Sequence, residues 1–225
     1  MRNIVLLVAL VFASVAACSA ATTIYGVTGL VETPDDSITA VGAPQLAGMY
    51  SSDFLGDGDS GNSYGGAIGV LPKIEVSAVE MDTGFATRSV VNAKYRFAAE
   101  SLVSPSITFG VVDVGRNLVD DVSAFVVIGK NLTSIAEGVA GKVIMPVRGT
   151  IGFGSGIYKG GFAGLTISAT PKMDLVVEYL DKGLRDKCTF NGAVRYNPVQ
   201  GLNITAGALD MSDFYGSVTY TMLKY

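Results

Sequence analysis

Two antiparallel strands and a tight turn are predicted by the stretch Gly164-Leu-Thr-Ile-Ser-Ala-Thr-Pro171-Lys-Met-Asp-Leu-Val-Val-Glu-Tyr-Leu-Asp181. Proline cannot donate a hydrogen bond to a strand ladder, so Pro171 marks a chain reversal and not a strand interior. The same plan of strand, proline turn and strand recurs around Pro72 and Pro198. Hairpins chained in this way form a meander, and a long meander must close on itself or cover its edges.

Alternating side chains give these strands one apolar and one polar face. Phe190, Val194 and Tyr196 share one face of a strand whose other face carries Asn191 and Arg195. Strands of about ten residues with such faces suit an outer-membrane barrel, with lipid outside and a polar lumen inside. A periplasmic β-sandwich shows the same period, because its strands are also half buried. Strand length and tyrosines near strand ends favour the barrel.

Counting these segments predicts an all-β fold, an antiparallel up-and-down transmembrane β-barrel of about twelve strands (ten to twelve). Pro72, Pro105, Pro171 and Pro198 follow the second, fourth, eighth and tenth strands, and therefore lie on the same side as both chain ends. We expect that side to be periplasmic, because turns are short there. The predicted strands span residues 45–54, 62–71, 74–82, 88–97, 105–114, 121–131, 147–157, 161–170, 173–182, 187–197, 202–211 and 213–224.

Residues 1–21 have the composition of an export signal. Arg2 supplies the positive charge, an apolar run follows, and small residues lead to Ala21. Two interpretations stay open: ordinary cleavage after Ala20 or Ala21, or a lipobox in which Cys18 becomes the acylated first residue. In both, residues 22–225 form a single barrel domain in the outer membrane, with outer-membrane lipid around it.

Composition argues against several classes of function. The chain has 16 basic and 20 acidic residues, and removal of Arg2 leaves 15 basic ones, a net charge of about −5. Nucleic-acid binding needs a basic surface, so we expect none. Histidine is absent, which excludes Ser-His-Asp catalysis and makes a zinc site unexpected. We therefore predict a protein that is not an enzyme and has no cofactor or metal.

Polar residues on the inner faces of two predicted strands form the candidate site. Basic side chains in a narrow lumen attract anions. In the alternative, these cations pair with Asp174, Glu178 and other carboxylates and leave a filled barrel. The lumen-lining candidates are Arg88, Asn92, Lys94, Arg96, Lys187, Asn191 and Arg195.

An ordered set of motifs resembles the YjbH-like outer-membrane proteins. The first is Gly29-Leu-Val-Glu-Thr-Pro34, and the others are Gly152-Phe-Gly-Ser-Gly156, Gly161-Phe-Ala-Gly-Leu165, Val177-Glu-Tyr-Leu-Asp181, Gly192-Ala-Val-Arg-Tyr-Asn-Pro198 and Gly201-Leu-Asn-Ile-Thr205. The resemblance implies an outer-membrane barrel, often a lipoprotein, associated with exopolysaccharide production or export. This chain is far shorter than typical members, and its last strand runs past Tyr220 to Tyr225.

Three functions follow as hypotheses. The first is a barrel that assists export of a surface exopolysaccharide, with the polysaccharide-export machinery as a partner. The second is a structural or passive-pore protein of the outer membrane. The third is a soluble periplasmic β-domain that binds a partner. Extraction behaviour separates the third from the others, and polymer secretion separates the first from the second.

Overall fold

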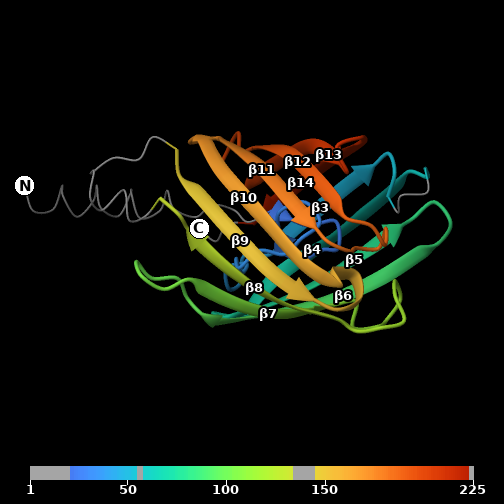
Figure 1. Cartoon of the computed structure of the whole chain (residues 1–225), viewed down its shortest axis with the longest axis horizontal. Helices are drawn as coiled ribbons and strands as arrows, with labels where there is room; N and C mark the ends of the chain where they lie inside the picture. The colour runs from blue at the N-terminus through green and yellow to red at the C-terminus, as the bar shows by residue number, and fades with distance from the viewer. Residues whose placement is uncertain (1–20, 55–57, 134–144, 223–225) are drawn as a thin grey trace, which may run out of the picture.

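The computed structural model describes residues 21–54, 58–133 and 145–222. Within them, strands β3 to β14 form one closed antiparallel barrel (Figure 1). Each strand pairs with its sequence neighbours, and β14 pairs with β3 to close the ring. The strands are β3 (Gln45–Ser51), β4 (Gly61–Leu71), β5 (Ile74–Asp82), β6 (Thr87–Ala98), β7 (Ser106–Val112), β8 (Ser123–Asn131), β9 (Val147–Gly154), β10 (Gly160–Thr170), β11 (Met173–Leu180), β12 (Thr189–Tyr196), β13 (Leu202–Leu209) and β14 (Asp213–Thr221).

All twelve predicted barrel strands are confirmed, with ends displaced by a few residues. The predicted signal and its Cys18 lie outside the described residues, except for Ala21. In the described part of the chain, no helix has the length and apolar character needed to cross a bilayer.

Alternating burial gives the barrel an apolar outer wall and a more polar inner wall. On β6, Val91 and Tyr95 are exposed while Asn92 and Lys94 are buried. On β12, Phe190 and Val194 are exposed while Asn191 is buried. Because side chains alternate between the two faces of a strand, the exposed sets form a continuous outer surface suited to lipid.

The barrel has two distinct ends. At the first, here called the terminal end, β3 begins, β14 ends and the Met222 amide donates to the Pro44 carbonyl oxygen at 2.8 Å. The connections that hold Pro72, Pro105, Pro171 and Pro198 lie at this end, together with the longer connection between β8 and β9. The opposite end, here called the loop end, carries the connections after β3, β5, β7, β9, β11 and β13.

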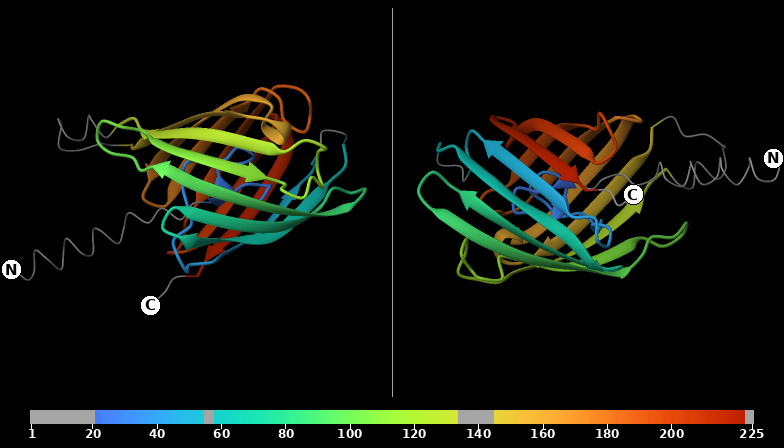
Figure 2. Two further views of the ribbon diagram at one scale, coloured as in Figure 1. Left: turned by 90° about the horizontal axis from the view of Figure 1, so that it is seen from below. Right: turned by 180° about the vertical axis from the view of Figure 1, so that it is seen from behind.

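The lumen is filled by the N-terminal insert, residues 21–40, for which the sequence predicted no structure (Figure 2). Strands β1 (Ala21–Thr22) and β2 (Thr28–Gly29) form a small hairpin within it. Every residue from Ala21 to Asp36 is buried. Gly26, at φ 92°, allows the tight reversal at the tip of the hairpin.

Two inward glycines give the insert its space. A Cβ at Gly129 would lie 1.9 Å from an oxygen of Asp36, and one at Gly164 would lie 2.1 Å from a methyl carbon of Leu30. No ordinary contact is that short, so the wall is built around the insert.

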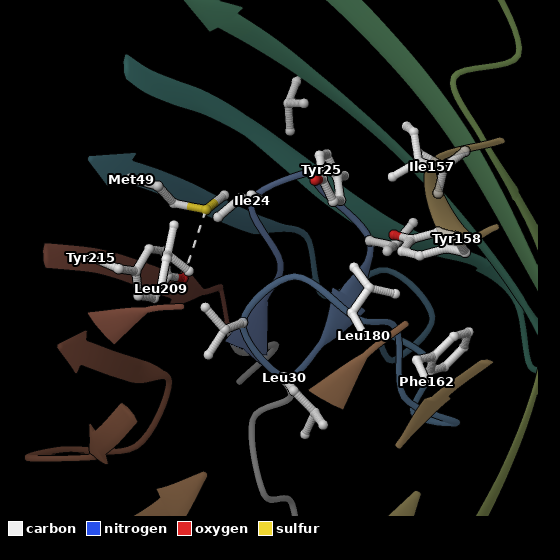
Figure 3. Close-up of a cluster of buried hydrophobic side chains, with 14 of the residues drawn as sticks. Ile24, Tyr25, Leu30, Met49, Ile157, Tyr158, Phe162, Leu180, Leu209 and Tyr215 are labelled. Carbon is white, nitrogen blue, oxygen red and sulfur yellow. Dashed lines mark hydrogen bonds between the residues drawn. The ribbon is translucent and has the colours of Figure 1, made fainter. Parts of the chain in front are cut away.

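An apolar cluster joins the tip of the insert to the barrel near the loop end (Figure 3). Ile24 lies beside Met49, Leu209 and Tyr215, which come from β3, β13 and β14. The Tyr25 ring packs edge-on against Tyr158 of the 3-10 helix η1 (Gly156–Tyr158), with ring centroids 6.0 Å apart. The side chains at the tip of the insert are therefore held by apolar packing.

Candidate functional site

Glu178 of β11 binds the backbone of the insert. Its carboxylate accepts hydrogen bonds from the amides of Val31, Glu32 and Thr33 at 2.8–3.2 Å and from the Thr33 hydroxyl at 2.7 Å. Asn191 donates a further bond at 2.7 Å. Glu178 is 1% exposed, and a buried carboxylate is tolerated only when donors satisfy it in this way.

Glu75 of β5 repeats this arrangement on another part of the wall. It accepts the amides of Thr28 and Thr39 at 3.0 and 2.8 Å, and both threonine hydroxyls as well. Its direct cross-strand neighbour is Lys94. The two carboxylates together bind five backbone amides of the insert.

Three of the predicted cations bind carbonyl oxygens of the insert. Lys94 donates to the carbonyl oxygens of Thr28 and Ser37 at 2.8 Å, and lies 3.8 Å from Asp35. Arg195 donates through Nη2 to the Gly29 and Leu30 carbonyls at 3.0 Å. Arg96 donates to the Asp36 carbonyl at 3.1 and 3.2 Å. No described ion pair joins them to Asp174 or Glu178, because the insert lies in the lumen and supplies acceptors of its own.

Two predicted asparagines link the insert to the loop end. Asn92 donates to the Tyr25 carbonyl at 2.8 Å and accepts the Asp113 amide at 3.0 Å. Asn191 donates to Glu32 at 2.7 Å and accepts the Asp210 amide at 2.8 Å. Asp113 and Asp210 both have positive φ, so each asparagine fixes a strained turn and the insert at once.

Arg88 and Lys187 are not brought together with the other five predicted residues. Both are exposed at the loop end. Arg88 donates to the Asn117 carbonyl at 2.6 Å, and Lys187 pairs with Asp210 at 2.7 Å. Arg88 lies next to the first residue of β6, and Lys187 lies in the connection before β12.

An ion network not predicted from the sequence lies at the terminal end. Arg148 of β9 binds Asp36 of the insert through Nε at 3.1 Å and Glu100 through Nη1 at 2.7 Å. Ser106 also donates to Asp36. Burial acts to raise the pKa of the Asp36 carboxyl, but the bonds and charge of Arg148 outweigh it and lower that pKa below its ordinary 3.8. Arg148 therefore holds a charged Asp36 in place.

Glu32 of the insert has the opposite environment. Burial, followed by the nearby Glu178 carboxylate, raises the pKa of Glu32 from 4.5 to about 7. The Asn191 amide donates to both carboxyl groups. One proton bound at Glu32 relieves the repulsion between them.

A polar pocket of about 420 Å³, here called the vestibule, lies beside this network. In the described residues no group of three or more acidic, cysteine or histidine side chains is arranged to hold a metal ion. The vestibule is lined by Asp35, Asp36, Ser37, Arg96, Ala99, Glu100, Ser106, Arg148, Thr166 and Arg195.

Glu75, Arg148 and Asp36 are site residues that the sequence pattern did not predict. Glu75 and Arg148 have inward parity on their strands, which was the one available signal. Their partners lie up to 112 residues away in the chain, and pattern alone does not identify contacts across such separations.

Comparison with known proteins places the fold. No protein-family model matches the chain, and no curated protein matches it. The structure of KdgM porin is similar, with a TM-score of 0.51 and 12% identity over 81% of this chain and 99% of that one. The Acinetobacter baumannii outer-membrane protein Omp33 is similar with a TM-score of 0.51 and 9% identity, over 81% and 98% of the two chains. At such identities the likeness shows the fold alone, and this chain is a closed twelve-stranded antiparallel β-barrel like those of these outer-membrane proteins.

Proposed function

We propose that this protein is an outer-membrane channel that its own N-terminal insert closes at rest. The observation that carries the proposal is that the buried insert is bound through its backbone by acidic and basic side chains of the barrel wall. None of these contacts is covalent, so the insert can leave without breaking a chemical bond. The polar wall would then line an aqueous lumen.

The chemistry of the wall supports a removable insert over a permanent filling. A barrel that only needed a filled interior would gain by using apolar residues, because buried ions are costly to desolvate. Glu75, Lys94, Glu178 and Arg195 are instead at most 5% exposed in the closed form. Hydrated charges are favourable in an open lumen, so the presence of these four side chains on the inner wall is consistent with an open state.

A second candidate function is an accessory role in polymer export. The vestibule opens at the terminal end, which we expect to face the periplasm, and it carries three guanidinium groups. That position suits a solute moving outward. It supports the exopolysaccharide role that the motif resemblance implies, in which this barrel works beside polysaccharide-export machinery.

Single-channel recording in planar bilayers tests the first candidate. We expect the wild-type protein to be closed for most of the recording, and the Glu178→Ala variant to show frequent open steps. Heat-modifiable migration on a gel confirms that each variant keeps a folded barrel. A folded Glu178→Ala barrel that stays silent would favour a structural role, and loss of secreted polymer in a deletion strain would favour export.

A further inference from the structure

Two arginines of the vestibule have no acidic partner. Arg148 is paired with both Asp36 and Glu100. Among the described residues, neither Arg96 nor Arg195 has a carboxylate within ion-pair distance. Arg195 is buried and Arg96 is half-buried. A buried cation without a counterion is costly, so Arg195 in particular calls for an explanation.

Arg195 carries the clearest sign of a missing partner. It is 5% exposed, and its Nε has no hydrogen-bond acceptor. Asp174 faces it across the β11–β12 ladder, but that carboxylate accepts the Ser168 hydroxyl at 2.7 Å and makes no ion pair. Asp35 of the insert pairs with Lys94, at 3.8 Å, and not with Arg195. The neighbouring charges therefore leave the Nε of Arg195 unsatisfied.

The guanidinium geometry indicates what would satisfy it. A carboxylate binds the paired donors Nε and Nη2 of arginine with two parallel hydrogen bonds. In the closed form Nη2 is shared by the carbonyls of Gly29 and Leu30, and Nε is covered. A carboxylate that binds this pair of donors must therefore displace the insert from Arg195.

We propose that the vestibule binds small hydroxylated carboxylates through Arg96 and Arg195, and that this binding releases the insert. A volume of about 420 Å³ falls within the usual range for small-ligand pockets. Thr166 lines the pocket and supplies a hydroxyl for the polar groups of a ligand. Arg96 holds the Asp36 carbonyl as Arg195 holds Gly29 and Leu30, so a ligand competes with the insert at both arginines. This inference rests on the proposed closed channel and names its ligand class.

Calorimetric titration of the detergent-solubilised full chain with glucuronate tests the binding. Glucose, which lacks the carboxylate, is the uncharged control ligand. We expect glucuronate alone to bind, and Arg96→Gln and Arg195→Gln each to weaken binding by about tenfold or more. Arg88→Gln, at the loop end of the strand that carries Arg96, is the matched control and should bind normally. If Arg195→Gln does not fold, Arg195→Lys keeps the charge but loses the paired donors, and should still weaken binding.

Equal binding of glucose, no binding of glucuronate, or equal loss in Arg88→Gln would overturn the proposal. Release of the insert is read separately in a Cys188→Ser chain, as faster maleimide labelling of a Val27→Cys thiol when glucuronate is added. Binding without faster labelling would overturn the release step. The proposed channel itself fails on a different result, a silent Glu178→Ala barrel in the bilayer.

Discussion

Two regions of the lumen wall hold the insert by different means. On the strand pairs β5–β6 and β11–β12, which lie on opposite sides of the ring, Glu75, Lys94, Glu178 and Arg195 bind its backbone. On the β13–β14 side, no described side chain forms a hydrogen bond with the insert, and contact is apolar, through Leu209 and Tyr215. The buried Thr219 hydroxyl of β14 has no partner at all. In the proposed closed channel, we therefore expect the two bonded strand pairs to hold the insert more strongly than β13 and β14 do.

The largest expected effect is that of Glu178→Ala on β11, one of the bonded strands. The change removes the acceptor of three insert amides, and buried donors left unpaired cost about 1–3 kcal/mol each. The free energy that keeps the insert in the lumen, here called its seating, should weaken by roughly 5 kcal/mol. The rate at which a maleimide labels Val27→Cys in a Cys188→Ser chain measures it, because labelling follows the open population.

Thr205→Ala is the matched control for this variant. Thr205 is equally buried on β13, and its hydroxyl binds Asn203 and not the insert. If it exposed Val27→Cys as strongly as Glu178→Ala does, the contrast between the bonded strand pairs and β13–β14 would be wrong.

A pH dependence of seating should come from Glu32. Its pKa is raised from 4.5 to about 7 in the closed form, so its contribution is fully present below pH 4.5 and is lost as the pH rises through 7. The loss is on the order of 3 kcal/mol. Asp36, whose pKa is lowered, titrates below this window. Other groups near Glu32 are Glu178, Tyr25, Asn191 and Arg185.

The labelling rate of Val27→Cys is divided at each pH by that of the exposed Cys188. The pH dependence that thiol reactivity itself has is then the same in both rates and cancels. This ratio should rise by roughly a hundredfold from pH 4.5 to 8. Glu32→Gln should flatten the rise. An unchanged slope in Glu32→Gln would assign the effect to another group.

A smaller effect is expected where the wall makes room for the insert. Gly164→Ala places a Cβ 2.1 Å from a Leu30 methyl carbon, and we expect about 1–2 kcal/mol of weaker seating because that side chain can partly move. Gly48→Ala, whose Cβ would meet nothing within 4 Å, is the control. Leu30→Ala in the same chain should cancel most of the effect of Gly164→Ala. Additive losses in the double variant would exclude this contact as the cause.

The smallest effect should come from Thr219→Val on the β14 side. Replacing an unpaired buried hydroxyl with a methyl group loses no hydrogen bond. We expect labelling of Val27→Cys to change by less than about threefold, equivalent to roughly 0.5 kcal/mol. A larger increase in labelling would show that this side also holds the insert through polar contacts.

The sequence predicted the barrel well and the insert not at all, for a physical reason. Each barrel strand carries its own two-residue period, and turns such as those at Pro72 and Pro171 bound it, so local pattern was sufficient. The same parity identified Lys94, Asn191 and Arg195 as inward residues. The insert has strands of only two residues. Its bonds to Glu178 span about 145 residues. The wall glycines Gly129 and Gly164 leave room for the insert, and that room exists only once the ring is closed.

The central claim is tested most directly by holding the insert out reversibly. A bulky thiol reagent linked through a disulfide to Val27→Cys, in the Cys188→Ser chain, cannot fit inside the closed barrel, because Val27 is fully buried. In single-channel recordings we predict sustained conductance after modification and closure after reduction. A modified barrel that stays closed, or conductance that reduction does not reverse, would contradict the insert as the element that closes the lumen.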